Sequence, residues 1–355
     1  MKRLPPPPNS AMLPPTMPEA ARPLSATRLP GGTVDMHCHL AGLGAGDSGC
    51  FISPRMRRNW RFNIYLRSFG VTRRELEQHG DQLVAARVSA ALAQSRWVRA
   101  AVVLAMDGVI GADGGLDRER TEFFVPEEFV AAMVARHPNL RFGASVNPWR
   151  PDALERLAQA QARGAVLVKW LPNIMGIDPA DRRWLPFYEK LAELGLPLLS
   201  HTGPEHSFPR TDETLGDPEK LRLPLRAGVT VIAAHVSASG AYHGEAGADR
   251  LARLMREFPN LYADISALTL INNLGHLYRA VRRPEFAGRL VYGTDFPLIQ
   301  TALVSPWYAV RLPLREKLAI ARERNPWDRD VRLKLGLGAT PDIFAASARM
   351  FGRGN

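Results

Sequence analysis

The feature that most constrains the fold is a series of short apolar runs separated by segments of helical periodicity. The runs cover residues 33–39, 101–106, 140–146, 165–168, 196–200, 228–234, 261–263 and 289–294. Runs that are apolar throughout indicate strands buried on both faces, and alternation with helices indicates a parallel sheet. Eight such units predict a (β/α)₈ TIM barrel, whose sites lie at the carboxyl ends of the strands. An open doubly wound sheet is the alternative, but its glycine fingerprint is missing after the first run.

The two ends of the chain differ from this repeating part. Residues 1–30 are rich in proline and hold few apolar residues, so we expect a disordered leader ahead of a barrel domain over residues 31–355. Residues 299–355 include Trp307, Trp327 and an apolar pattern over 345–351. We expect them to form a loop and helices that pack on the barrel.

Composition limits the classes of function. The net charge is +11 and there are two cysteines, Cys38 and Cys50. The basic residues are mostly arginines spread along the chain, with no nucleic-acid-binding motif, and a basic surface alone does not indicate function. No apolar run approaches the roughly 20 residues of a membrane span, and the proline-rich start is unlike a signal peptide. We therefore expect a cytoplasmic protein with no membrane partner. An acidic small-molecule substrate fits the charge as well as nucleic acid does, and without a nucleic-acid-binding motif we do not expect nucleic acid; a homo-oligomer is left open.

Polar residues follow five of the predicted strands. Because side chains alternate along a strand, His37 and His39 point to one side and Cys38 to the other, where we expect it to pack in the core. The remaining strand ends carry Lys169, His201, His235 and Asp295. If the barrel closes, these groups converge, and imidazole and carboxylate are ligands of zinc, manganese or iron.

These motifs resemble the amidohydrolase superfamily, and its amidohydrolase-related branch (amidohydrolase family 2) in particular, over about residues 33–352. The resemblance rests on residues 35–39 (DMHCH), 199–203 (LSHTG), 234–235 (AH) and 292–297 (YGTDFP). It implies a catalytic divalent metal, zinc or else manganese or iron, bound by His37, His39, His201 and Asp295. It also implies that His235 binds a second ion or positions water or substrate.

Lys169 leaves the number of ions open. In binuclear members of the superfamily a lysine at this place is carboxylated and bridges two ions. The alternative is an unmodified lysine that binds a substrate carboxylate or pairs with a nearby acid. The number of metal ions, one or two, depends on which of these holds.

The resemblance, with this ligand set, implies a metal-dependent hydrolase that attacks an amide, lactone or ester of a small acidic molecule with activated water. Asp295 would take the proton of the water, and His235 would help to polarise the carbonyl. A nonoxidative decarboxylase of unsaturated or aromatic acids is the first alternative, although such enzymes generally lack the lysine. A noncatalytic barrel that binds a ligand or nucleic acid is the second.

Other residues carry weaker predictions. Phe62, Tyr65 and Phe69 recur at helical spacing, with Arg57, Arg58 and Arg61 toward the other side. Those arginines either form a solvated face or supply one side chain that holds a substrate carboxylate. We expect specificity to depend on the loops 42–55, 108–115 and 207–218. Three other strand-end groups either support the site or cap turns: Asp107, Asn147 and Asp264. Two histidines beyond site strands, His206 and His243, either contact substrate or lie on the surface.

Overall fold

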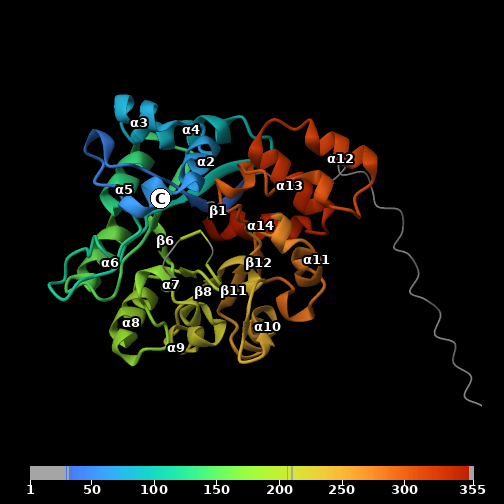
Figure 1. Cartoon of the computed structure of the whole chain (residues 1–355). Coiled ribbons are helices and arrows are strands. Elements are labelled where there is room, and N and C mark those ends of the chain that lie inside the picture. Colours follow the sequence, from blue (N-terminus) through green and yellow to red (C-terminus); the bar gives the residue numbers. More distant parts are fainter. Residues whose placement is uncertain (1–28, 30–31, 206, 209–210, 352–355) are drawn as a thin grey trace, which may run out of the picture.

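The eight predicted strands form one parallel sheet. The computed structural model describes residues 29, 32–205, 207–208 and 211–351, so the predicted leader lies outside the described residues. In sheet order the strands are β1 (Thr33–His39), β3 (Val98–Leu104), β5 (Leu140–Ala144), β6 (Ala165–Trp170), β7 (Leu198–Ser200), β8 (Val231–Ala233), β11 (Leu261–Asp264) and β12 (Leu290–Val291). The helices surround this sheet (Figure 1). The prediction of a (β/α)₈ barrel is confirmed.

Backbone hydrogen bonds between β1 and the segment that follows β12 bring the two edges of the sheet together. Met36 N donates to Tyr292 O at 3.2 Å, and Asp295 N donates to His37 O at 2.8 Å. Farther along, His39 N donates to Phe296 O at 2.9 Å. The last strand end is thereby fixed beside the first, although some 260 residues separate them in sequence.

Two apolar layers hold the barrel together. The inner layer consists of side chains that point into the barrel, such as Val34, Leu104 and Ile232, and it includes Phe351 from the C-terminal helix α14 (Pro341–Phe351). The outer layer lies between strands and helices and includes Cys38 and Cys50, both buried and free. Cys38 therefore packs in the core on the face opposite to the two histidines, as predicted.

The outer helices lie between the strands along the chain. They are α4 (Gln82–Ala93), α5 (Glu127–Arg136), α6 (Ala153–Ala162), α8 (Leu185–Glu193), α9 (Arg222–Arg226), α10 (Gly247–Glu257) and α11 (His276–Ala280). The C-terminal helices α12 (Leu314–Ala321) and α13 (Pro326–Gly336) pack on each other, and α14 packs on β1 and β12. Trp327 is fully buried, whereas Trp307 is 50% exposed. No helix in the described part of the chain is long and apolar enough to cross a membrane.

Additional short elements lie near the carboxyl ends of the strands. The segment after β1 forms α1 (Pro54–Arg58) and α2 (Trp60–Ser68), where the apolar spacing had predicted one helix. Asn59 separates them because its backbone is extended and its side chain accepts the N–H of Arg61 to cap α2. The other elements are α3 (Arg73–His79), α7 (Pro172–Met175), the pair β2 (Phe51–Ile52) and β4 (Phe123–Phe124), and the pair β9 (Ala241–Tyr242) and β10 (Glu245–Ala246).

Candidate metal centre

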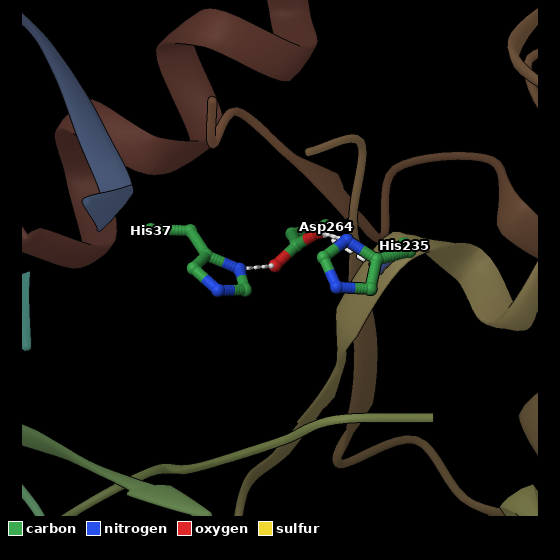
Figure 2. Close-up of side chains that lie close together, drawn as sticks. All are labelled: His37, His235 and Asp264. Carbon is green, nitrogen blue, oxygen red and sulfur yellow. Dashed lines mark hydrogen bonds and ion pairs between the residues drawn. The ribbon is translucent and has the colours of Figure 1, made fainter. Parts of the chain in front are cut away.

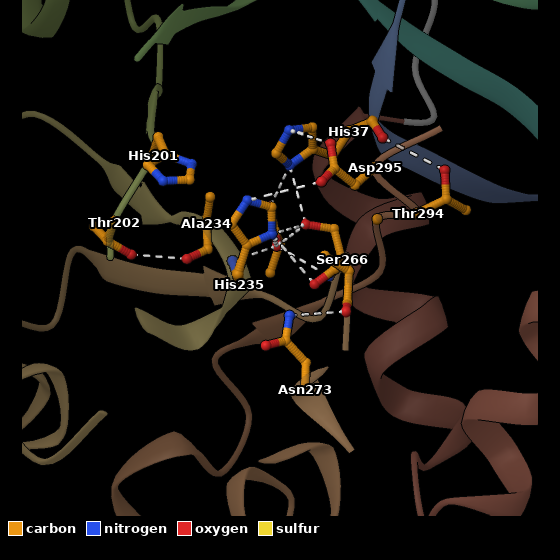
Figure 3. Close-up of polar contacts among 12 residues, drawn as sticks. His37, His201, Thr202, Ala234, His235, Ser266, Asn273, Thr294 and Asp295 are labelled. Atoms are coloured by element: carbon orange, nitrogen blue, oxygen red, sulfur yellow. Dashed lines mark hydrogen bonds and ion pairs between the residues drawn. The ribbon is translucent and has the colours of Figure 1, made fainter. Parts of the chain in front are cut away.

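One pocket at the carboxyl ends of the strands brings together all six residues that the sequence marked. Its polar floor is formed by His37, His39, Lys169, His201, His235 and Asp295. The rings of His37 and His39 have centroids 5.1 Å apart, and His235 lies 5.2 Å from both His37 and His201. Figure 3 shows His37, His201, His235 and Asp295 grouped around one space.

Three donor atoms lie close enough together to hold a single ion. Asp295 Oδ1 lies 3.1 Å from His39 Nε2 and 3.5 Å from His37 Nε2. His37, His39 and Asp295 can each offer one ligand atom within 4.8 Å of the others. Nitrogen and carboxylate donors from separate strands form the kind of set that binds zinc, manganese or iron.

Asp264, at the end of β11, orients His37 from behind. The Nδ1 of His37 donates to Oδ2 of Asp264 at 2.8 Å, so Nε2 is the nitrogen left to face the pocket. Oδ1 of the same carboxylate accepts the backbone N–H of His235 at 2.8 Å. Figure 2 shows the carboxylate between the two histidines. Carboxylates that fix the tautomer of a ligating histidine are common around protein metal sites.

Ser266 orients His235 in the same way. Its hydroxyl donates a short hydrogen bond to Oδ1 of Asp264 and lies 2.8 Å from Nδ1 of His235. Because that hydroxyl proton goes to the carboxylate, Nδ1 of His235 is the donor of the second bond, which leaves Nε2 on the pocket side. Nε2 of His235 lies 4.0 Å from Asp295 Oδ2. Both His235 (φ 59°) and Asp295 (φ 62°) have left-handed backbones, a conformation often found at functional sites.

His201 offers a nitrogen without a partner among the described residues. The side chain is buried, and its Nε2 forms no hydrogen bond in that part of the chain. Its Nδ1 lies 3.7 Å from Oε2 of Glu205, a carboxylate that also lines the pocket. A buried unpaired nitrogen is costly, and a metal ion would satisfy it. The donor set therefore fits a divalent ion.

Lys169 points into the same polar floor. Its Nζ lies 3.2 Å from Nε2 of His37, and the side chain is 1% exposed. Burial lowers the pKa of Lys169 to about 8, against the opposing effect of Asp264 and Asp295. A larger fraction of this amine is therefore uncharged near neutral pH than for an exposed lysine.

Burial and mutual charge also set the ionisation of the other groups. Burial lowers the pKa of His37 to about 3 and that of His201 to about 4. Burial alone would raise the pKa of Asp295, but His37, His39 and His235 hold it well below its usual range. The site therefore presents neutral His37 and His201 rings beside an ionised carboxylate at neutral pH, the protonation states that metal ligands need.

A buried network supports the position of Asp295. Asp35 accepts the N–H of Thr294 at 2.9 Å and the Nε1–H of Trp327 at 2.8 Å. The hydroxyl of Thr294 also donates to Asp35, at 2.5 Å. Burial raises the pKa of Asp35 to about 6 despite these donors. The network joins β1, the residue before Asp295 and helix α13.

Several residues that the sequence left open lie elsewhere. Asp107 forms an ion pair with Arg150 at 2.6 Å, and Asn147 donates to backbone oxygens, so both have structural roles. The loop 108–115 supplies no residue to the described pocket lining, whereas the other two predicted loops supply Ile52, Ser207 and Phe208. His243 is exposed and outside that lining, and His206 lies outside the described residues.

The predicted arginine contact does not occur in the described part of the pocket. Arg57, Arg58 and Arg61 are absent from its lining. Arg57 instead donates to the backbone oxygen of Leu43 at 2.6 Å, and the other two side chains are exposed. The interpretation of a solvated basic face is the one that fits.

Comparison with known proteins agrees with this arrangement. The amidohydrolase family model matches residues 34–332. The chain belongs to the amidohydrolase family. No curated protein sequence matches it significantly. Family members are metal-dependent enzymes that act on small molecules, so the chain is placed among such enzymes.

Several solved structures are similar to this amidohydrolase at low sequence identity. An uncharacterised TIM-barrel protein from Bordetella bronchiseptica is 19% identical with a TM-score of 0.53, over 87% of this chain and all of that one. A 2,6-dihydroxybenzoate decarboxylase bound to 2,6-dihydroxybenzoate is 13% identical with a TM-score of 0.50, over 91% of this chain and all of that one. A probable 2-pyrone-4,6-dicarboxylic acid hydrolase from Acinetobacter baumannii is 12% identical with a TM-score of 0.49, over the same shares.

Proposed function

We propose that this amidohydrolase is a metal-dependent hydrolase that cleaves an amide, lactone or ester of a small molecule. The observation that carries the proposal is the meeting of His37, His39 and Asp295 beside the unpartnered Nε2 of His201 in one pocket. A divalent ion held by these residues would acidify a water and polarise the carbonyl. Zinc is the metal we propose, with manganese and iron as alternatives.

The residues of the chain would then have distinct tasks. Asp295 is ionised and lines the pocket, so it would accept the proton of the attacking water and pass it to the leaving group. His235 presents Nε2 to the pocket and would hold the carbonyl or the departing atom in place. Asp264 and Ser266 would keep the rings of His37 and His235 in the required tautomers.

Lys169 supports a site for two ions. Six donors line the pocket, more than one tetrahedral ion needs. The hydrogen-bond partner of the Lys169 amine is a neutral ring nitrogen of His37, which is a poor partner for a buried ammonium. Carboxylation would turn the amine into an anion able to bridge two cations. We therefore propose a carboxylated Lys169.

A nonoxidative decarboxylase is the second candidate. It is favoured by the likeness of fold to 2,6-dihydroxybenzoate decarboxylase, which concerns the barrel alone. The position of Lys169 beside His37 supports hydrolysis instead, because a single-ion decarboxylase has no need of a bridging group.

The first experiment measures metal content and activity together. The purified protein should contain zinc, and it should hydrolyse members of a panel of lactones, esters and amides without releasing carbon dioxide from aromatic acids. His37→Ala should lose both metal and activity, whereas His79→Ala, a change of an exposed histidine, should lose neither. A metal-free active protein, or carbon dioxide as the product, would contradict the proposal.

Two further properties belong to the same proposal. Cys38 and Cys50 are free and buried, which suits a reducing compartment such as the cytoplasm. A homo-oligomer stays a prediction that size-exclusion chromatography with light scattering would test.

A further inference from the structure

Above its polar floor, the pocket is walled by apolar side chains. Thirteen of the residues that line it are alanine, leucine, isoleucine, methionine, phenylalanine or proline. They are Leu40, Ala41, Ile52, Met56, Phe62, Leu66, Phe69, Met106, Phe123, Leu171, Phe208, Pro297 and Leu298. A wall of this kind gains binding free energy from apolar groups and gives little to an anion.

The apolar wall comes from segments that the rest of the fold holds in place. Helices α1 and α2 contribute Met56, Phe62 and Leu66, each at most 5% exposed. Phe123 of β4 and Phe208 face each other with ring centroids 6.5 Å apart. Because these groups are packed against neighbours, the wall exists before a ligand arrives.

The polar groups in the wall are negative or already paired. Glu205 is the acid beside His201, and its Oε1 accepts the N–H of Ser207 at 2.7 Å. Tyr65 forms a side-chain hydrogen bond with Ser207. A carboxylate on the substrate, away from the reacting group, would therefore meet Glu205 and apolar surface.

Cationic side chains that could bind such a carboxylate are scarce in the described lining. Apart from histidines, the described lining contains one basic side chain, Lys169. That side chain lies on the polar floor against His37. Within the described residues no arginine lines the pocket. Recognition of a dicarboxylate would ordinarily use such a group away from the reacting carbonyl.

We propose that the substrate of this site has one polar reacting group and a bulky apolar body, an aryl or alkyl group, and carries no acidic group. This inference rests on the proposed function, and it replaces the expectation of an acidic substrate. The reacting group would lie on the polar floor, and the body would extend between α2 and the Phe123 and Phe208 pair. Each methylene that the wall buries should tighten binding by about fourfold.

The test uses two metal-chelating probes of equal chain length, octanohydroxamate and its ω-carboxy analogue, titrated calorimetrically into the zinc-loaded full chain. We expect octanohydroxamate to bind at least about 30-fold more tightly than the analogue. Equal or tighter binding of the ω-carboxy probe would overturn the inference, and so would failure of both probes to bind.

Variants locate the effect in the wall. Phe208→Ala and Phe123→Ala, changes of half-buried side chains, should each weaken octanohydroxamate several-fold, and Phe208→Arg should narrow the gap between the probes. Trp149→Ala changes a partly exposed aromatic side chain outside the pocket and should leave both affinities unchanged. If Trp149→Ala and the wall variants lost equal affinity for octanohydroxamate, the apolar body would not bind at the wall, and the inference would be contradicted.

The two proposals fail in different ways. If the neutral probe is preferred but no ester, lactone or amide is cleaved, the hydrolase proposal fails and the inference stands. If hydrolysis occurs and substrates whose body ends in a carboxylate are cleaved faster than their methyl-ended analogues, the inference fails and the hydrolase proposal stands.

Discussion

Asp264 Oδ2 lies 2.8 Å from Nδ1 of His37, and both side chains are buried within the barrel. The bond joins the seventh strand of the barrel to the first, and it decides which nitrogen of His37 faces the pocket. Burial alone would raise the pKa of Asp264, but His37, His235 and Ser266 hold it well below its usual range. The carboxylate is thus an ionised, permanent acceptor.

Asp264→Asn should weaken metal binding, because an amide cannot accept as strongly and can offer the wrong donor to His37. We expect zinc affinity to fall about 10- to 100-fold, measured by competition with a chelator. Circular dichroism should show an intact fold. Asp342→Asn, an exposed acid on α14, is the matched control and should keep wild-type affinity. Unchanged affinity in Asp264→Asn would exclude this orienting role.

Lys169→Met should halve the metal content from two ions to one, because the neutral side chain keeps the volume but cannot be carboxylated. Elemental analysis gives the ion count, and a carbon-13 carbamate signal from labelled bicarbonate should vanish in the variant. A wild-type protein with one ion, unaffected by the substitution, would show that Lys169 acts as an unmodified amine.

Glu127→Gln should stabilise the protein at alkaline pH. Burial, with the nearby Asp107, raises the pKa of Glu127 from 4.5 to about 8. Between those values the folded state keeps a proton that the unfolded state has lost, so the free energy of unfolding falls as pH rises through this range. The variant removes this loss of unfolding free energy, which should be on the order of 4 kcal/mol at pH 8.

Chemical denaturation at about pH 4.5 and pH 8 measures the Glu127 effect. The advantage of the variant should be small at the lower pH and largest at the higher one. Glu128→Gln changes the adjacent exposed acid and should show no such trend. An advantage independent of pH would mean that packing, not ionisation, is responsible.

Trp327→Phe should destabilise the fold, because it removes the 2.8 Å hydrogen bond to Asp35 and leaves that buried carboxylate short of a donor. We expect a loss of about 1–3 kcal/mol in unfolding free energy. Since Asp35 also holds Thr294, metal affinity should fall as well. Trp307→Phe, at a half-exposed tryptophan, should change neither quantity. A Trp327→Phe variant that loses stability but keeps its metal affinity would show that this network does not hold the metal site in place.

Much of the barrel could be predicted from the sequence because its signals are local. Apolar runs between helical segments marked all eight strands, and polar residues at their ends marked His37, His201 and Asp295. The boundaries were less certain: the predicted strand 228–234 is Val231–Ala233 in the structure, since the chain turns at Ala234. Local patterns place an element well and its ends poorly.

The residues that orient the histidines of the site had weak signals in the sequence. Asp264 was one of several acids at strand ends, and Asp107 looked equivalent to it, yet Asp264 binds His37 while Asp107 pairs with Arg150. Ser266 and Glu205 were not predicted at all. Their roles depend on neighbours far away in sequence or on the path of a loop, neither of which has a repeating pattern.

The sequence by itself determined the barrel and the six polar residues that follow its strands, since periodicity and alternation are properties of consecutive residues. Only the tertiary structure decided that Asp264 orients His37, that the Arg57 and Arg61 side chains lie away from the pocket, and that apolar groups from α1, α2 and β4 wall it. These facts depend on how the barrel closes and how the segments that cover it pack, which bring together residues separated by tens to hundreds of positions.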